Sequence, residues 1–224
     1  MPSESVRFLS PTVRVHAFDA HAEGPTVLIQ AGIHGDEVAG VHAVEELLEE
    51  GLRPKRGRLL LIPVMNPAAY RVRRRAAPDG LDLNRVFPGD AAATEPERRL
   101  ARLFMDLVEE QRPALVATLH ESRKRHHPDV EPSFGQTVIY GVRPMPGVVS
   151  KVVDRMNASL EHPYERWAPH YFPVATSSTE VIVEATGCVG LCIETWMGFE
   201  ERRRIDMHKA VVRHLLGHFG LIGG

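Results

Sequence analysis

The chain of 224 residues lacks the features that mark disulfide-stapled and membrane-spanning proteins. Its two cysteines, Cys188 and Cys192, lie too far apart along a strand to form a disulfide, so both are expected to be small core residues. No apolar run approaches the roughly 18 residues that are needed to cross a bilayer. The N-terminal segment MPSESVRFLS also lacks the layout of a secretory signal, so the sequence predicts a cytoplasmic protein.

A strong charge of either sign is also absent. The formal net charge is −2, which gives no electrostatic field that would attract nucleic acid or an anionic membrane. With 43% hydrophobic and 25% charged residues, the composition is that of an ordinary globular protein. The length suits one domain with a continuous core, so we predict a single domain over residues 1–224 and make no prediction about oligomeric state.

Short apolar runs alternate with amphipathic stretches, a pattern that is typical of a layered α/β domain. We predict strands at Pro25–Ala31, Arg58–Met65, Ala114–Leu119, Thr137–Val142 and Val189–Glu194. We predict helices at Glu37–Glu50, Val148–Leu160 and Glu200–Phe219, and a further helix that begins at a capping box, Thr94–Glu97, and buries Leu100, Leu103, Phe104, Leu107 and Val108. The β-branched segment Thr176–Thr186 is either a strand or an ordered loop, and His126–Phe134 is a loop.

Reactive side chains follow three of the predicted strands. His34 and Glu37 come after the first strand, His120 follows another apolar run, and Glu194 ends a third. Ligands of open α/β sheets bind beyond the carboxyl ends of the strands, so these side chains are expected to meet at one edge. Two imidazoles and one carboxylate are a common ligand set for catalytic zinc. An uncoordinated carboxylate such as Glu194 would then take a proton from a water and pass it to the leaving nitrogen.

Each of these residues alone also has an ordinary structural interpretation. Glu37 would favour the N-terminus of the following helix electrostatically, and His-x-x-Glu is a short motif. Gly32 and Gly35 permit a sharp turn that would aim His34 and Glu37 at one point. The prediction of a metal therefore depends on the other motifs in the chain.

Five short motifs occur in a recognisable order. They are GIHGDE (32–37), MNPAAY (65–70), DLNRVFPG (82–89), LHES (119–122) and IET (193–195). With these motifs the chain resembles the succinylglutamate desuccinylase/aspartoacylase family of zinc carboxypeptidase-like hydrolases, over roughly residues 25–219. The resemblance implies a three-layer α/β/α catalytic domain with a mixed central sheet, of the phosphorylase/hydrolase-like type.

The resemblance also implies roles for the matching residues. His34, Glu37 and His120 would hold one Zn²⁺ per chain, and Glu194 would be the general base and then the general acid. A second group, Asn84 and Arg85, would receive the substrate carboxylate. An upstream arginine would stabilise the oxyanion, and the sequence favours Arg75, with Arg74 as the alternative because the spacing to Arg85 is shorter than in many relatives.

Two further alternatives stay open. Glu184, in VEATG, has a context similar to that of the catalytic glutamate, although Glu194 is favoured because it follows an apolar strand directly. A two-metal site would use Asp36, Glu121, His126 and His127, for which a polar rim around the pocket is the preferred interpretation. Two neighbours in the arginine run, Arg71 and Arg73, are expected to face solvent.

The predicted activity is hydrolysis of an amide bond adjacent to a carboxylate, most simply the deacylation of a small N-acyl amino acid. The alternative is a carboxypeptidase or peptide amidase that acts on a short peptide with a free carboxylate in a more open cleft. A non-catalytic metal-binding or carboxylate-binding module is the third hypothesis. Many aspartoacylase-type relatives carry a C-terminal β-rich domain over the cleft, and we expect none here because the sequence stops at Gly224 after one helix.

Overall fold

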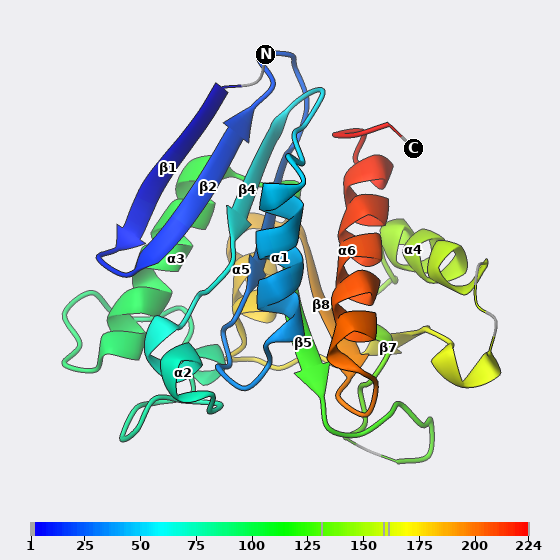
Figure 1. Ribbon diagram of the computed structural model, residues 1–224. Coiled ribbons are helices and arrows are strands. Elements are labelled where there is room, and N and C mark those ends of the chain that lie inside the picture. The colour runs from blue at the N-terminus through cyan, green and yellow to red at the C-terminus, as the bar shows by residue number, and fades with distance from the viewer. Residues whose placement is uncertain (1–2, 131, 159, 161, 224) are drawn as a thin grey trace.

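Eight strands of the described residues (3–130, 132–158, 160 and 162–223) form one mixed sheet in the computed structural model (Figure 1). In chain order they are β1 (Ser3–Ser10), β2 (Val13–Asp19), β3 (Thr26–Ala31), β4 (Arg58–Ile62), β5 (Leu115–Ser122), β6 (Thr137–Tyr140), β7 (Ala168–Tyr171) and β8 (Val189–Trp196). Their order across the sheet is β1-β2-β4-β3-β5-β8-β6-β7.

The four central strands, β4, β3, β5 and β8, run parallel, so their carboxyl ends meet at one edge of the sheet. The β1–β2 hairpin adds antiparallel to β4 on one side, and β6 adds antiparallel to β8 on the other, with β7 parallel to β6. Strand β4, which follows β3 in the chain, pairs with one edge of β3, and the later strand β5 pairs with the other edge of β3. The strand order therefore reverses between β3 and β5, which is the usual place for a ligand in an open α/β sheet.

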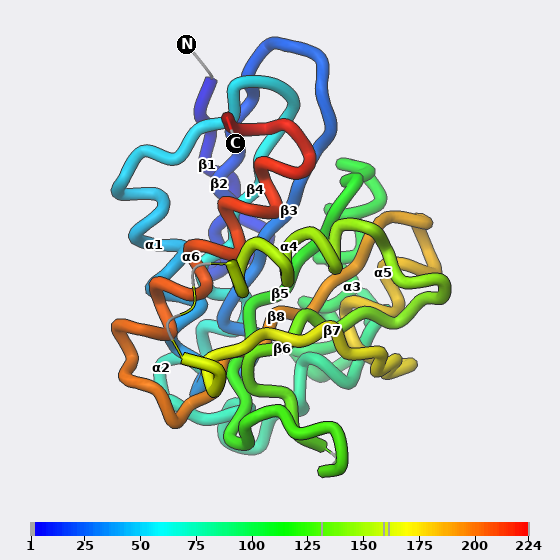
Figure 2. Tube along the Cα trace, turned by 90° about the vertical axis from the view of Figure 1, so that its right-hand side faces the viewer, coloured from blue at the N-terminus to red at the C-terminus, as the bar shows by residue number. Residues whose placement is uncertain are grey.

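Helices cover both faces of the sheet (Figures 1 and 2). One apolar layer contains residues of α1 (Ala39–Glu49), α4 (Gly147–Ala158) and α6 (Glu201–His218), and the other contains residues of α3 (Pro96–Gln111) and α5 (Ser178–Thr186). The short helix α2 (Pro67–Val72) and the 3-10 turns η1 (Leu83–Arg85) and η2 (Pro163–Glu165) lie in connections. Within the described part of the chain, no helix has the length and apolar character that a membrane crossing requires.

The three layers follow from the way successive side chains of each strand point to opposite faces of the sheet. In β4, Leu59 and Leu61 join the α1–α4–α6 layer, whereas Leu60 and Ile62 join the α3–α5 layer. Successive side chains of a strand point to opposite faces, and a strand that is apolar on both faces must be covered twice. The predicted α/β class, with its mixed sheet, is confirmed.

Most predicted elements are confirmed with shifts at their ends. The predicted strands at Arg58–Met65 and Thr137–Val142 end earlier, at Ile62 and Tyr140. The helix predicted from Glu37 begins at Ala39, and the helix predicted to reach Leu160 ends at Ala158. Strand β5 continues to Ser122 and β8 continues to Trp196. The prediction that His120 lies beyond a strand end was therefore wrong, because it is a residue of β5 itself.

Three other predictions were wrong. The segment predicted as a strand or loop contains α5, whose N-terminus is capped by the Ser177 side chain. The capping box at Thr94 does not form, because the helix begins at Pro96 and the Thr94 hydroxyl donates to the carboxylate of Glu95 over 3.1 Å. Leu103 is 39% exposed on α3, and the buried face of that helix uses Ala101 and Met105 instead. The strands β1, β2 and β7 and the helix α2 were not predicted.

Candidate metal centre and substrate pocket

The turn after β3 depends on two glycines for different reasons. Gly32 has a φ of +64°, which residues with a side chain rarely adopt. Gly35 lies so close to α2 that an added β carbon would be 2.1 Å from the carbonyl carbon and oxygen of Ala69. The Gly35 N–H also donates to the Arg74 carbonyl over 2.9 Å. The turn is thereby pressed against α2, which fixes where His34 and Glu37 point.

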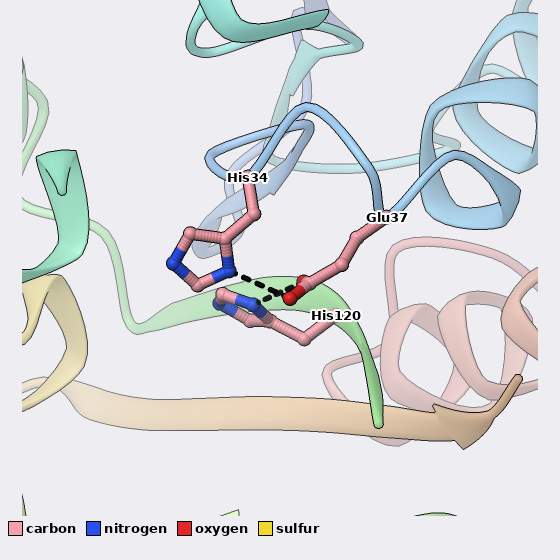
Figure 3. Close-up of side chains that lie close together, drawn as sticks. All are labelled: His34, Glu37 and His120. Carbon is pink, nitrogen blue, oxygen red and sulfur yellow. Dashed lines mark hydrogen bonds and ion pairs between the residues drawn. The ribbon is translucent and has the colours of Figure 1, made fainter. Parts of the chain in front are cut away.

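Three buried side chains converge beside this turn (Figure 3). The Nδ1 atom of His34 lies 2.7 Å from Oε1 of Glu37, and the Nδ1 atom of His120 lies 2.7 Å from Oε2 of the same carboxylate. Donor atoms of all three residues lie within 4.8 Å of one another. Two imidazole nitrogens and a carboxylate oxygen at this spacing fit a catalytic zinc ion, which takes such a ligand set. The structure thus brings together the three residues that the sequence predicts as ligands.

Charged neighbours hold the ring of His34. Its Nε2 lies 3.2 Å from Asp82 Oδ1, and Arg75 in turn donates to the other Asp82 oxygen over 2.9 Å. Burial lowers the pKa of His34, but the carboxylates of Glu37 and Asp82 outweigh it and raise this pKa to about 9. A carboxylate on the far nitrogen is the usual support of a metal-binding histidine, because it fixes the ring and increases its basicity.

A second buried network lies behind His120. The next residue, Glu121, accepts the Ala39 N–H over 2.9 Å and forms a short ion pair with Arg204. Burial raises the pKa of Glu121. His208 of α6 is fully buried, with Nε2 3.1 Å from the Thr195 hydroxyl. Burial, with the charges of His120 and Arg204, lowers the pKa of His208 to about 3.

Glu194 lies beside the three converging residues. It is the register partner of His120 across the β5–β8 pair, and 9% of it is exposed. Its Oε2 atom has no hydrogen-bond partner among the described residues, while Oε1 accepts the Cys192 thiol over 3.6 Å. Burial and the nearby negative charge of Glu37 raise the pKa of Glu194 to about 8. A buried carboxylate with one uncommitted oxygen is suited to exchange a proton with a water or a substrate.

The orientation of Asn84 is set by α5. Its side-chain carbonyl accepts the Ser178 N–H over 2.9 Å and the Ser178 hydroxyl over 3.1 Å. The amide NH₂ of Asn84 is the group that remains available as a donor. Arg85 follows directly, is exposed, and lines the same pocket. These two donors fit an anionic group such as a carboxylate.

One pocket of about 370 Å³ contains these groups. Arg75, Asn84, Arg85 and Glu194 line it together with the three converging side chains. Its other wall is apolar and aromatic, formed by Phe134, Ile139, Tyr140, Phe172, Val174 and Met197. Cys192 also lines it, so the prediction that this cysteine is only a small core residue was wrong. Burial raises the pKa of the Cys192 thiol well above its usual value, which keeps the thiol protonated.

Several alternative site residues lie elsewhere. The Arg74 side chain is exposed outside the pocket lining, and its backbone carbonyl accepts the Gly35 N–H. Arg71 and Arg73 are exposed, as predicted, and Glu184 is exposed on α5 and is not one of the lining residues. The structure therefore places Arg75 rather than Arg74, and Glu194 rather than Glu184, at the pocket.

The residues considered for a second metal have other contacts. Asp36 pairs with Arg123 over 3.1 Å, and His126 donates to the Ser133 carbonyl over 2.9 Å. Among the described residues, one other donor set lies within 4.8 Å, formed by His120, Cys192 and Glu194. It shares His120 with the first set, so the two sets describe one centre.

Sequence reasoning assigned no role to Asp82, Ser178 or Glu180. Asp82 had a usable signal, because it opens the DLNRVFPG motif two residues before Asn84. Ser178 and Glu180 had no such signal in the sequence, since they lie 94 or more residues beyond Asn84. Packing of α5 brings Ser178 to Asn84 and Glu180 to the pocket.

Known families and proteins match part of this chain in sequence. The succinylglutamate desuccinylase/aspartoacylase catalytic domain family matches residues 23–127. The chain is 43% identical over 79 residues to an N-alpha-acetyl-L-2,4-diaminobutyric acid deacetylase of Halomonas elongata, which covers 34% of this chain and 23% of that protein. It is 37% identical over 93 residues to a succinylglutamate desuccinylase of Burkholderia pseudomallei, covering 40% and 26%. The matched stretches thus span about a quarter of these curated relatives.

Comparisons of structure show the fold. The cell shape determinant Csd4 of Helicobacter pylori, in its product-bound form, superimposes with a TM-score of 0.80 at 20% identity and covers 98% of this chain and 56% of its own. A succinylglutamate desuccinylase/aspartoacylase from Rhodobacter sphaeroides gives a TM-score of 0.72 at 24% identity, covering 100% and 66%. The architecture described above is therefore that of this group of proteins.

Proposed function

We propose that the chain, whose residues 23–127 match the succinylglutamate desuccinylase/aspartoacylase catalytic domain family, is a zinc-dependent hydrolase that removes the acyl group from an N-acyl amino acid. The observation that carries the proposal is the meeting of His34, Glu37 and His120 with Glu194 in one pocket. The curated relatives support it, because those named above are a deacetylase and a desuccinylase of amino acids.

His34, Glu37 and His120 would hold the metal. When bound there, zinc would acidify a water and act as a Lewis acid toward the amide carbonyl. Glu194 takes a proton from the attacking water and returns it to the leaving nitrogen, a role that fits its raised pKa and its uncommitted oxygen. Arg75, held by Asp82, faces the pocket and stabilises the negative charge that develops on the carbonyl oxygen.

Asn84 and Arg85 bind the substrate carboxylate. Ser178 holds the Asn84 amide with its NH₂ available, and a guanidinium offers a planar pair of donors that suits a carboxylate. Fixing that carboxylate places the neighbouring amide next to Glu194 and the metal ligands. The reaction is thus confined to amides that lie close to a carboxylate.

A carboxypeptidase is the second candidate. The aromatic and aliphatic wall, with Phe134 and Phe172, favours a substrate with an apolar part, such as the side chain of a peptide. Csd4, which shares the fold, is described as a D,L-carboxypeptidase.

The test is a substrate comparison with purified protein. N-acetyl and N-succinyl amino acids are assayed beside short peptides with free and amidated C-termini, after removal of metal and after addition of one equivalent of Zn²⁺. We expect zinc-dependent hydrolysis of acylated amino acids. Preferential cleavage of peptides with a free C-terminus would instead support the carboxypeptidase, and no zinc-dependent turnover of either class would refute both.

A further inference from the structure

One acidic side chain in the pocket has no part in the chemistry above. Glu180 lies in the first turn of α5 and lines the pocket. Its carboxylate extends over the backbone of Gly141, directly after β6, where an added β carbon would lie 1.7 Å from Glu180 Oε1. A glycine at this position therefore leaves room for the carboxylate.

The position of Glu180 does not serve helix capping. In the sequence Ser177-x-x-Glu180, the serine side chain accepts the Glu180 N–H over 3.3 Å, as in a capping box. The reciprocal bond, from the Ser177 N–H to the Glu180 carboxylate, is absent, because that N–H donates to the Val174 carbonyl over 2.8 Å. The carboxylate is thereby released from its usual local contact and turned toward the pocket.

No cation of the described residues pairs with Glu180. The arginines that line the pocket have other partners, since Arg75 pairs with Asp82 and Arg123 pairs with Asp36. Arg85 donates to the Asn84 carbonyl over 2.8 Å. Burial raises the pKa of Glu180, and no neighbouring charge offsets that effect. A carboxylate that is partly withdrawn from water and has no cation beside it would be stabilised by a ligand that brings a positive charge.

The helix also places Glu180 on a defined side of the pocket. Ser178, two residues earlier in α5, contacts Asn84, which belongs to the proposed carboxylate-binding pair. Glu180 lines the same pocket as Asn84 and Arg85. A substrate whose carboxylate is bound by that pair would therefore meet Glu180 through its amino-acid half, whose side chain on the α carbon is the part free to extend along the pocket.

We propose that Glu180 is a specificity-determining residue that binds a side-chain ammonium on the amino-acid half of the substrate. The preferred substrate class is then an N-acylated diamino acid, with its carboxylate on Asn84 and Arg85 and its distal amine on Glu180. This inference rests on the proposed hydrolase function, and it adds the charge of the side chain that the pocket selects. An acidic side chain would be repelled from the same place.

The test compares matched substrates. Nα-acetyl derivatives of 2,4-diaminobutyrate, ornithine and lysine are each assayed against the isostere in which a methyl group replaces the ammonium. In the zinc-loaded protein, at least one diamino acid should exceed its isostere in kcat/KM about tenfold or more, the size expected for a hydrogen-bonded charge. Glu180→Gln should remove this preference, and Glu180→Asp should keep part of it. The control Glu184→Gln, one helical turn later in α5 and outside the pocket lining, should keep all of it.

Equilibrium binding provides a readout that does not need turnover. Calorimetry with the free diamino acids and their isosteres should show the same preference in the wild type and its loss in Glu180→Gln, with thermal melting to verify that the variants fold. Binding preference without turnover would show that the hydrolase proposal fails while the assignment of Glu180 stands. Turnover without preference, equal binding of both members of each pair, binding of neither, or a preference that survives in Glu180→Gln would overturn the assignment.

Discussion

Glu194 and His120 lie directly opposite one another on the neighbouring parallel strands β8 and β5. Register partners on adjacent strands project from the same face of the sheet, so the proposed general base and a proposed metal ligand are held by backbone hydrogen bonds rather than by loops. The spacing between them is thus set by the sheet itself.

This relationship leads to the first prediction. Glu194→Gln keeps the size of the side chain and removes its ability to take a proton. We expect kcat to fall by about 10²- to 10⁴-fold, the usual contribution of a general base. Zinc content should stay near that of the wild type, because Glu194 is not one of the proposed ligands. Steady-state kinetics and metal analysis test this, with Glu184→Gln as the control; wild-type activity in Glu194→Gln would contradict the mechanism.

The second prediction concerns the support of His34. Asp82→Asn removes the negative charge beside His34 Nε2 and weakens the hold on Arg75. We expect the affinity for zinc to fall by about 10- to 100-fold, as is typical for the outer partner of a metal-binding histidine. Competition with a chelating dye measures it. The exposed Asp79 in the same loop provides the control variant Asp79→Asn, which should bind zinc as the wild type does.

A third prediction tests the carboxylate site. Arg85→Gln should lower kcat/KM for a substrate with a free carboxylate by about tenfold or more, because a charged hydrogen-bond donor is lost. The methyl ester of the same substrate should be hydrolysed equally by both proteins. The control Arg71→Gln changes an exposed arginine outside the pocket. An equal loss on acid and ester would mean that Arg85 does not recognise the carboxylate.

The fourth prediction concerns the turn after β3. In Gly35→Ala the new β carbon would overlap the Ala69 carbonyl, so either the turn or α2 must move. We expect a loss of about 1–3 kcal/mol in the free energy of unfolding, together with weaker zinc binding. Chemical denaturation and metal titration measure the two effects. Gly147→Ala, where nothing lies within 4 Å of the added carbon, should leave both unchanged.

The pH dependence of folding gives a fifth prediction. The pKa of His208 is about 3 in the fold, against 6.5 for an unperturbed histidine, so the unfolded chain binds the proton first as the pH falls. Stability from this residue is complete above about pH 6.5 and is lost toward about pH 3, with a slope of up to about 1.4 kcal/mol per pH unit. Denaturation curves at several pH values should show a flatter dependence in His208→Gln than in the wild type. The exposed His127 supplies the control His127→Gln, which should follow the wild type.

The central strands could be predicted from sequence because their apolar runs are short and bounded by turn residues. The β1–β2 hairpin carried a weaker signal, in which Val13, Val15 and Ala17 are buried at alternate positions. Helix α5 could not be predicted from its composition, since Thr179, Val181 and Ile182 favour strands. Its caps and its packing on the sheet overrule that preference.

The residues of the site can likewise be divided into those that the sequence predicts and those that it does not. His34 and Glu37 occur in one motif, so their proximity is local, and strand topology accounts for His120 and Glu194. The choice of Arg75 over Arg74 was open in the sequence, because neighbouring residues of a loop point in directions that only the folded backbone determines. Glu180 reaches the pocket through contacts between segments that are far apart in the chain, which no local pattern encodes.

The contact between Ser178 and Asn84 has a consequence for substrate selection. The proposed metal ligands and carboxylate-binding residues all lie between His34 and His120, whereas Glu180 enters on a later helix that this contact attaches to them. Exchange of Glu180 would alter which side chain is accepted, while Ser178 in the same turn keeps Asn84 in place. Substrate selection and metal binding are thus carried by different segments of the chain, so that one exchange at position 180 would change the first and leave the second in place.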